Sequence, residues 1–257
     1  MSKLKSVKML QALQIKKKLL IGYLLAGYPS KDDFIEALNC MQDAGVDVLE
    51  IGIPSFNPEN DGEIIREANK VADFSVLDDM AFWQEVRKVA RVPIWIMGYN
   101  NELISTPRYL ELAKAGIADC FVLPQMCIEE HLSLAEELAP YACDVAGFVN
   151  PSTSHEEAEK CFLSLAVVYF QLHTGKTGKQ TGKEKDTFFD LLSLSQRYES
   201  TYMFAGFGID TKDRVSYLIN AGFDGAVVGT AMIRHQNESL DALSDYVMCL
   251  KSGVIQE

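Results

Sequence analysis

The stretch "DAGVDVLEIG" (residues 43–52) joins the end of a predicted helix to the start of an apolar run. Two further stretches, "KAGIADCFVL" (114–123) and "NAGFDGAVVG" (220–229), repeat its order of an Ala-Gly pair, an apolar residue and a strand-like segment. Glycine adopts without penalty the left-handed conformation that commonly ends a helix, so the glycine of each copy is predicted to end one. These glycines are Gly45, Gly116 and Gly222.

Outward from these junctions, eight short apolar runs alternate with amphipathic segments along the whole chain. The expected strands are 19–26, 46–53, 92–99, 118–124, 143–149, 165–172, 202–208 and 224–230. Continuous apolar strands with helical crossovers indicate a parallel sheet covered on both faces. A length of 257 residues is typical of one (β/α)8 barrel. We therefore expect an α/β protein, a (β/α)8 TIM barrel forming a single domain over residues 1–257, with an N-terminal helix.

Composition narrows the function class. A net charge of −12 argues against nucleic-acid or anionic-membrane partners, which require basic patches. The apolar stretch that ends at Pro29 is too short to span a membrane, so we expect a cytoplasmic protein. The six cysteines show no CxxC spacing and lie in apolar runs, which favours buried thiols over disulfides or a metal site. No metal is expected.

Glycine-rich segments follow the last two expected strands, "GFGID" (206–210) and "VGTAMI" (228–233). In (β/α)8 barrels the active site lies at the carboxyl ends of the strands, and strands seven and eight commonly hold phosphate. Backbone amides and the start of a helix attract an anion there, although simple tight turns are the alternative. The expected phosphate- or substrate-binding residues are Gly206, Phe207, Gly208, Gly229 and Thr230.

Three polar residues at the same end of the barrel are candidates for catalysis. Glu50 interrupts an apolar strand, and an apolar surrounding would raise its pKa toward that of a proton donor. The alternative is a structural carboxylate that pairs with a donor group on a neighbouring strand. Asp61 either enters the site or caps the helix that follows it. Tyr169 either reaches the barrel mouth with its hydroxyl or is a core aromatic residue.

The longest polar stretch is "HTGKTGKQTGKEKD" (173–186). Its place after the sixth expected strand and its richness in Gly, Thr and Lys favour a mobile loop over the ligand site. An inert surface loop is the alternative.

Together these segments resemble a known family. The motifs are "VDVLEIGIP", "DGEIIREAN", "MGYNNEL", "VVYFQLHTGKTG", "AGFGID" and "GAVVGTAMI". In order and spacing they resemble the tryptophan synthase alpha subunit, from residue 22 to the last helix. The resemblance implies a (β/α)8 barrel that cleaves indole-3-glycerol phosphate to indole and glyceraldehyde 3-phosphate. It also implies that no cofactor is used and that the barrel docks onto a pyridoxal-phosphate beta subunit.

The same resemblance implies a role for each matching residue. Glu50 matches the general acid/base, Asp61 the carboxylate that holds the indole N–H, and Tyr169 the tyrosine beside the glutamate. Thr177 matches the threonine of the loop that closes over substrate. Positions that bind phosphate match Gly178, Gly208, Gly229 and Thr230.

Departures from the family pattern fall in the loops. In "PSFNP" (54–58) Phe and Ser are exchanged, and Asn57 replaces an aspartate important for communication with the beta subunit. Contact with a beta subunit through Ser55, Phe56 and Asn57 is therefore expected to be weakened. Further replacements are Tyr28, Glu63, Gln125, Cys127, His173 and Lys176.

Three hypotheses remain. The first is the family reaction on a small phosphorylated substrate, with a beta partner. The second is a paralogue that acts on another phosphorylated compound as a lyase or isomerase. The third is a catalytically weak subunit that modulates a beta partner, and retention of both Glu50 and Asp61 counts against it.

Overall fold

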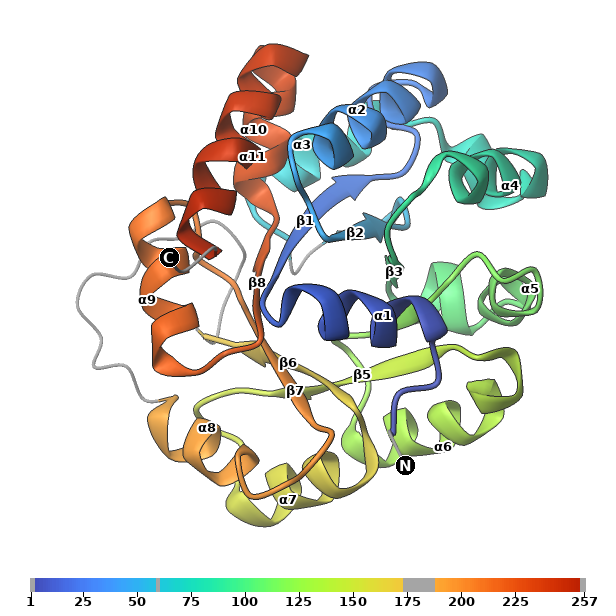
Figure 1. Ribbon diagram of the computed structural model, residues 1–257. Helices are drawn as coiled ribbons and strands as arrows, with labels where there is room; N and C mark the ends of the chain where they lie inside the picture. Colours follow the sequence, from blue (N-terminus) through green and yellow to red (C-terminus); the bar gives the residue numbers. More distant parts are fainter. Residues whose placement is uncertain (1–2, 59–60, 173–187, 255–257) are drawn as a thin grey trace.

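The computed structural model describes residues 3–58, 61–172 and 188–254. Eight parallel strands close into a barrel in chain order (Figure 1). They are β1 (Leu19–Leu25), β2 (Val48–Gly52), β3 (Ile94–Met97), β4 (Cys120–Val122), β5 (Asp144–Val149), β6 (Val167–Gln171), β7 (Tyr202–Gly206) and β8 (Gly225–Val228). The predicted barrel and its eight strands are confirmed, and each expected range contains its strand. The expected ranges are longer because apolar residues continue past the last ladder hydrogen bond.

Helices surround the barrel (Figure 1). They are α1 (Val7–Lys16), α2 (Lys31–Asp43), α3 (Glu63–Val71), α4 (Met80–Val89), α5 (Arg108–Lys114), α6 (Ile128–Leu138), α7 (His155–Ser164), α8 (Phe189–Ser195), α9 (Lys212–Ala221), α10 (Thr230–Glu238) and α11 (Leu240–Val254), with short turns η1 (Phe74–Leu77), η2 (Asn100–Ile104) and η3 (Ala139–Tyr141). The three predicted helix-ending glycines have φ of +108° at Gly45, +65° at Gly116 and +121° at Gly222. This confirms the prediction from the repeated junction.

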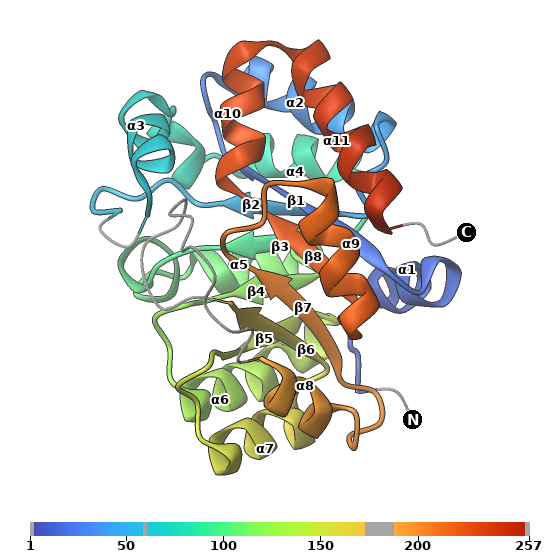
Figure 2. The same ribbon diagram turned by 90° about the vertical axis from the view of Figure 1, so that its left-hand side faces the viewer.

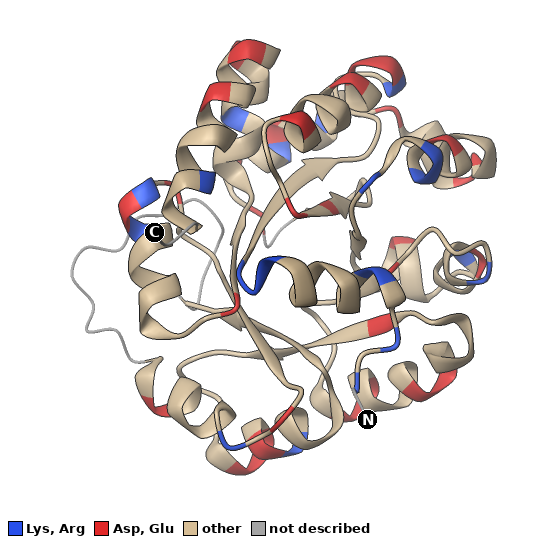
Figure 3. Cartoon of the chain, in the orientation of Figure 1, with Lys and Arg blue, Asp and Glu red and all other residues tan. Residues whose placement is uncertain are grey.

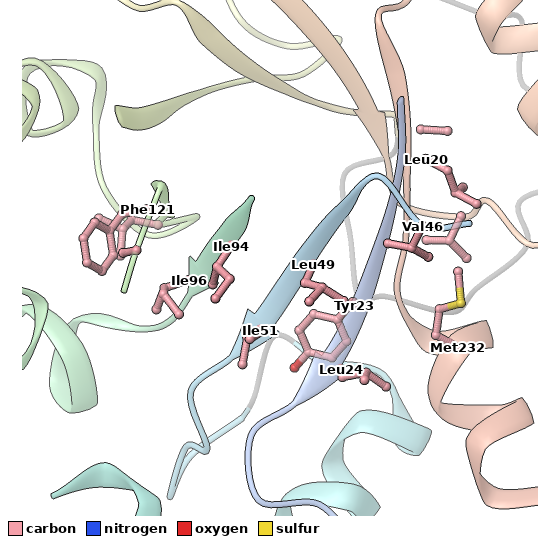
Figure 4. Packing of buried hydrophobic residues seen from close by; sticks show 14 of the residues in the cluster. Leu20, Tyr23, Leu24, Val46, Leu49, Ile51, Ile94, Ile96, Phe121 and Met232 are labelled. Carbon is pink, nitrogen blue, oxygen red and sulfur yellow. The ribbon is translucent and has the colours of Figure 1, made fainter. Parts of the chain in front are cut away.

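Alternate residues of each strand enter two separate cores. One set packs between the barrel and the helices, where Leu20 and Val46 lie near Met232 of α10 (Figure 4). The other set, which includes Val48 and Trp95, fills the barrel interior. Because side chains alternate along a strand, the second residue after Val48 also points inward. That residue is Glu50.

Helix α1 closes the amino-terminal end of the barrel. Its Met9 is buried in the interior core, and the indole N–H of Trp95 donates to the Met9 Sδ at 3.2 Å. Ser6 caps the helix and its hydroxyl donates to Asp119 at 2.7 Å. Figure 2 shows α1 at one end of the barrel and α3 toward the opposite end. Space for a ligand is therefore left at the carboxyl ends of the strands.

The cysteines correct one expectation. All six are free thiols, and Cys120, Cys143 and Cys161 are buried as predicted. Cys127 and Cys249 are exposed, so the prediction of buried thiols is wrong for these two. They lie at the start of α6 and on the outward face of α11, where an apolar sequence context does not ensure burial.

Within the described ranges, no helix is both long and apolar enough to cross a membrane.

Candidate active site

A cavity opens at the carboxyl ends of the strands and encloses about 820 Å³ of atom-free space, counted to its open mouth. It brings together most of the residues singled out from the sequence. The ones that line it are Glu50, Asp61, Tyr169, Phe207, Gly208, Gly229 and Thr230. Gly206 is not among the lining residues, and Thr177 and Gly178 lie outside the described residues.

Glu50 of β2 lines the cavity. It is paired in register with Tyr23 of β1 and Trp95 of β3, and its side chain is buried. No other side chain among the described residues forms a hydrogen bond or an ion pair with its carboxyl group, so the alternative of a paired carboxylate is wrong. Burial raises the pKa of Glu50 to about 8. The group therefore carries a proton at neutral pH and can deliver it to a ligand.

Asp61 lies on the loop between β2 and α3 and points into the same cavity. The residue that caps α3 is Gly62, without a side-chain capping bond, so the alternative of Asp61 as a helix cap is wrong. Burial raises the pKa of Asp61 to about 6, against the opposing effects of a hydrogen bond from Tyr99 and the charge of Arg66. Asp61 is consequently an anion at neutral pH, whereas Glu50 is neutral.

An aromatic wall borders the two carboxyl groups. The rings of Tyr169 and Phe148 stack at 4.8 Å, and Phe207 meets Tyr169 edge-on at 6.1 Å. Phe207 adopts φ of +72°, which is strained for a bulky residue and which holds its ring at the cavity. Such a wall suits a flat aromatic ligand.

Gly206, expected among the phosphate-binding residues, packs against Tyr169. A Cβ added to Gly206 would lie 2.2 Å from the Tyr169 hydroxyl, so the tyrosine ring occupies the space beside this glycine. The glycine makes room for Tyr169 and does not itself line the cavity.

Gly206→Ala is therefore expected to displace Tyr169 and to cost about 1–3 kcal/mol of unfolding free energy, as other overpacked positions do. Urea unfolding measures this. Gly229→Ala is the matched control, because a Cβ there meets no atom closer than 3.8 Å. Equal loss of unfolding free energy in both variants would contradict the conclusion that Gly206 makes room for the Tyr169 ring.

The residues Gly208, Gly229, Thr230 and Arg234 line the cavity together with Asp210. Gly229 caps α10 and accepts the Met232 N–H at 2.8 Å, which leaves the preceding amides of the helix start facing the cavity. Gly208 in the β7–α9 loop has φ of +71° and lines the same cavity as the start of α10. The side chain of Arg234, one turn into α10, also reaches the cavity, since helical side chains lean toward the amino terminus. These groups favour a phosphate.

Sequence reasoning missed several cavity residues, among them Tyr23, Phe148 and Arg234. Tyr23 had a detectable signal, because it continues the inward alternation of Leu19 and Ile21. Its hydroxyl lies over Gly52, where an added Cβ would approach within 2.1 Å. Within the described ranges, no cluster of three or more His, Cys, Asp or Glu side chains could hold a metal ion.

Comparison with known proteins identifies the family of the chain. A family model described as Tryptophan synthase alpha chain matches residues 9–252. The chain belongs to the tryptophan synthase alpha chain family. Among curated tryptophan synthase alpha chains, that of Methanopyrus kandleri is 29% identical over 92% of this chain and 88% of its own. That of Methanoregula boonei is 30% identical over 93% of this chain and 95% of its own.

Solved tryptophan synthase structures share the fold. A structure of Mycobacterium tuberculosis tryptophan synthase superimposes with a TM-score of 0.84 at 22% identity, covering 98% of each chain. A chain from a structure of the Pyrococcus furiosus tryptophan synthase a2b2 complex gives a TM-score of 0.79 at 24% identity, over 92% of this chain and 99% of that one. This member of the tryptophan synthase alpha chain family thus keeps the family's barrel.

Proposed function

We propose that this protein cleaves indole-3-glycerol phosphate to indole and glyceraldehyde 3-phosphate. The observation that carries the proposal is the placement of a protonated Glu50 and an ionised Asp61 in one aromatic cavity whose far end attracts phosphate. Membership of the tryptophan synthase alpha chain family supports the same reaction. No cofactor is required by the chemistry described below.

The cavity accommodates the substrate in one orientation, with the phosphate at one end and the indole ring at the other. The phosphate binds at Gly208, Gly229 and Thr230, and Arg234 adds a positive charge at the mouth. A local positive charge is needed to attract the phosphate, because acidic residues are spread over the outer helices (Figure 3) and the net charge of the protein is −12. The indole ring then lies along the aromatic wall, with its N–H toward Asp61 and its C3 toward Glu50.

The reaction proceeds by proton transfer. Glu50 donates its proton to indole C3, which forms an indoleninium cation that the Asp61 carboxylate stabilises. The Glu50 carboxylate then removes the proton of the glycerol hydroxyl next to the ring. The C–C bond breaks, its electron pair returns to the ring, and the oxygen becomes the aldehyde of glyceraldehyde 3-phosphate. Glu50 is protonated again at the end of the cycle.

The two pKa values predict a bell-shaped pH dependence of kcat/KM. Glu50 must be protonated, so activity is lost as the pH rises through about 8. Asp61 must be ionised, so activity is lost as the pH falls through about 6. Both groups belong to the free enzyme, and kcat/KM reports them. Steady-state rates from pH 5 to 9.5 check this, and a rate that stays constant from pH 7 to 9.5 would be inconsistent with Glu50 as the acid.

The proposal is tested by incubating the purified protein with indole-3-glycerol phosphate and measuring both products. Indole and glyceraldehyde 3-phosphate are expected in equal amounts. Absence of both products, with the protein alone and with a beta subunit added, would reject the reaction. In that case the paralogue hypothesis, cleavage or isomerisation of another phosphorylated compound, would stand in its place.

We also propose a beta-subunit contact at the loop formed by Ser55, Phe56 and Asn57. The Phe56 side chain is 76% exposed and stacks on Phe74 at 4.4 Å between ring centroids. An exposed aromatic ring that rests on a partly buried one, as Phe56 rests on Phe74, favours a protein partner. The solved relative from Pyrococcus furiosus occurs in an a2b2 complex. Because Asn57 replaces the acidic residue of the family pattern, we expect the affinity to be weak.

A further inference from the structure

The phenol of Tyr23 is a polar group of the cavity that the reaction steps above do not use. Tyr23 of β1 lines the cavity, and its side chain is only 5% exposed. Among the described residues, no backbone or side-chain group forms a hydrogen bond with its hydroxyl. A buried tyrosine hydroxyl ordinarily has a hydrogen-bond partner. A molecule that enters the cavity can supply this partner.

The side chain of Tyr23 spans the cavity wall from the phosphate end to the neighbourhood of Glu50. A Cβ added to Gly229 would lie 3.8 Å from the Tyr23 Cβ, so the side chain starts beside the amino end of α10. Its ring reaches from β1 toward β2 (Figure 4), where a Cβ added to Gly52 would lie 2.1 Å from the hydroxyl oxygen. Tyr23 is paired in register with Glu50, and Gly52 is the next inward position on β2. The hydroxyl therefore lies over the position that follows Glu50 toward the cavity mouth.

We propose that Tyr23 is a specificity-determining residue, whose hydroxyl forms a hydrogen bond with a hydroxyl group of the glycerol chain of the substrate. This role rests on the proposed function, which puts the phosphate at Gly229 and the reacting carbon atoms beside Glu50. The glycerol chain joins these two groups, and the two ends of the Tyr23 side chain lie at the same two places. The chain hydroxyls are thus within the part of the cavity that the phenol faces.

The chemistry of a phenol suits such a partner, because it both donates and accepts hydrogen bonds as an alcohol does. Burial raises the pKa of the Tyr23 phenol well above its ordinary value, so the hydroxyl keeps its proton and does not act as a base at neutral pH. Tyr23 therefore binds and orients the glycerol chain. A site with this hydroxyl discriminates against a ligand without chain hydroxyls, since the phenol is then left unpaired.

The test compares two ligands in proteins in which Glu50→Gln blocks cleavage. Indole-3-glycerol phosphate carries the hydroxyls of the glycerol chain, whereas indole-3-propanol phosphate has the same ring and phosphate without them. Calorimetric titration measures the dissociation constants of both ligands with and without the additional change Tyr23→Phe. Loss of the phenol oxygen is expected to weaken binding of indole-3-glycerol phosphate roughly 5–10-fold and not to weaken binding of indole-3-propanol phosphate.

Tyr109→Phe is the matched control, since Tyr109 donates to Glu137 at 3.0 Å and lies outside the cavity. It should leave both dissociation constants unchanged. If Tyr23→Phe fails to fold, 4-fluorophenylalanine at position 23 fills the space of the oxygen without a donor, and the same difference between the ligands is expected.

Unchanged binding of indole-3-glycerol phosphate, or an equal loss with both ligands, would overturn the role of Tyr23. Failure of the unmodified protein to release indole, with the difference between the ligands retained, would reject the proposed function alone. Absence of binding of either ligand to the Glu50→Gln protein would reject both.

Discussion

Glu50→Gln is expected to lower the rate of indole release roughly 10³-fold while leaving ligand binding intact. The amide keeps the size of the side chain but cannot deliver a proton to indole C3. Indole release by the variant measures the loss in kcat. Calorimetric titration with indole-3-propanol phosphate, which cannot be cleaved, measures binding, and we expect the dissociation constant to change less than about threefold.

Glu85→Gln provides the control, because Glu85 is exposed on α4, outside the cavity. A Glu50→Gln variant that retains more than about a tenth of the activity would show that another group supplies the proton.

Stability gives an independent check on Glu50. The pKa of its carboxyl is about 8 in the folded protein, against 4.5 as the ordinary value. The folded state therefore binds more protons than the unfolded state between these pH values, and stability falls as the pH rises through this window. Glutamine has no such dependence, so the variant should gain in Tm relative to the unmodified protein between pH 5 and pH 8.

Asp61→Asn is expected to lower kcat/KM roughly 10²-fold, because a neutral amide cannot balance the charge of the indoleninium cation. Part of the loss should appear in KM, since the amide also holds the indole N–H less strongly than an anion does. Rates over a range of substrate concentrations separate the two contributions.

Asp32→Asn makes the same chemical change at an exposed position in the first turn of α2, and should leave the rates unaltered. If Asp61→Asn keeps the full kcat/KM at pH 7, then the cation is stabilised elsewhere and the proposed orientation of the indole ring is wrong.

The barrel itself was predictable because the evidence for it is local. Apolar runs, Ala-Gly junctions and chain length suffice to predict eight strands in a parallel sheet. Strand bounds were less accurate, because they depend on hydrogen bonds to neighbouring strands. Residues 48–52, for example, form β2 where 46–53 was expected.

The site was predictable only in part. Glu50 follows from the alternation along β2, whereas Asp61 required the family resemblance, since its position also permits a helix cap. Tyr23 escaped because its role depends on its contact with Gly52 of the neighbouring strand, which a linear pattern does not reveal. The packing of Gly206 against the Tyr169 ring was not predictable for the same reason.

The most direct test of the account is to run the cleavage of indole-3-glycerol phosphate in heavy water and to analyse the indole by mass spectrometry. Every proton that Glu50 can deliver exchanges with solvent, so the indole should carry one deuterium at C3 from the first turnover, and Glu50→Gln should form almost none. Indole kept in heavy water without protein gives the background exchange. Unlabelled indole formed at the full rate would contradict protonation of the ring by Glu50, and with it the mechanism proposed for this cavity.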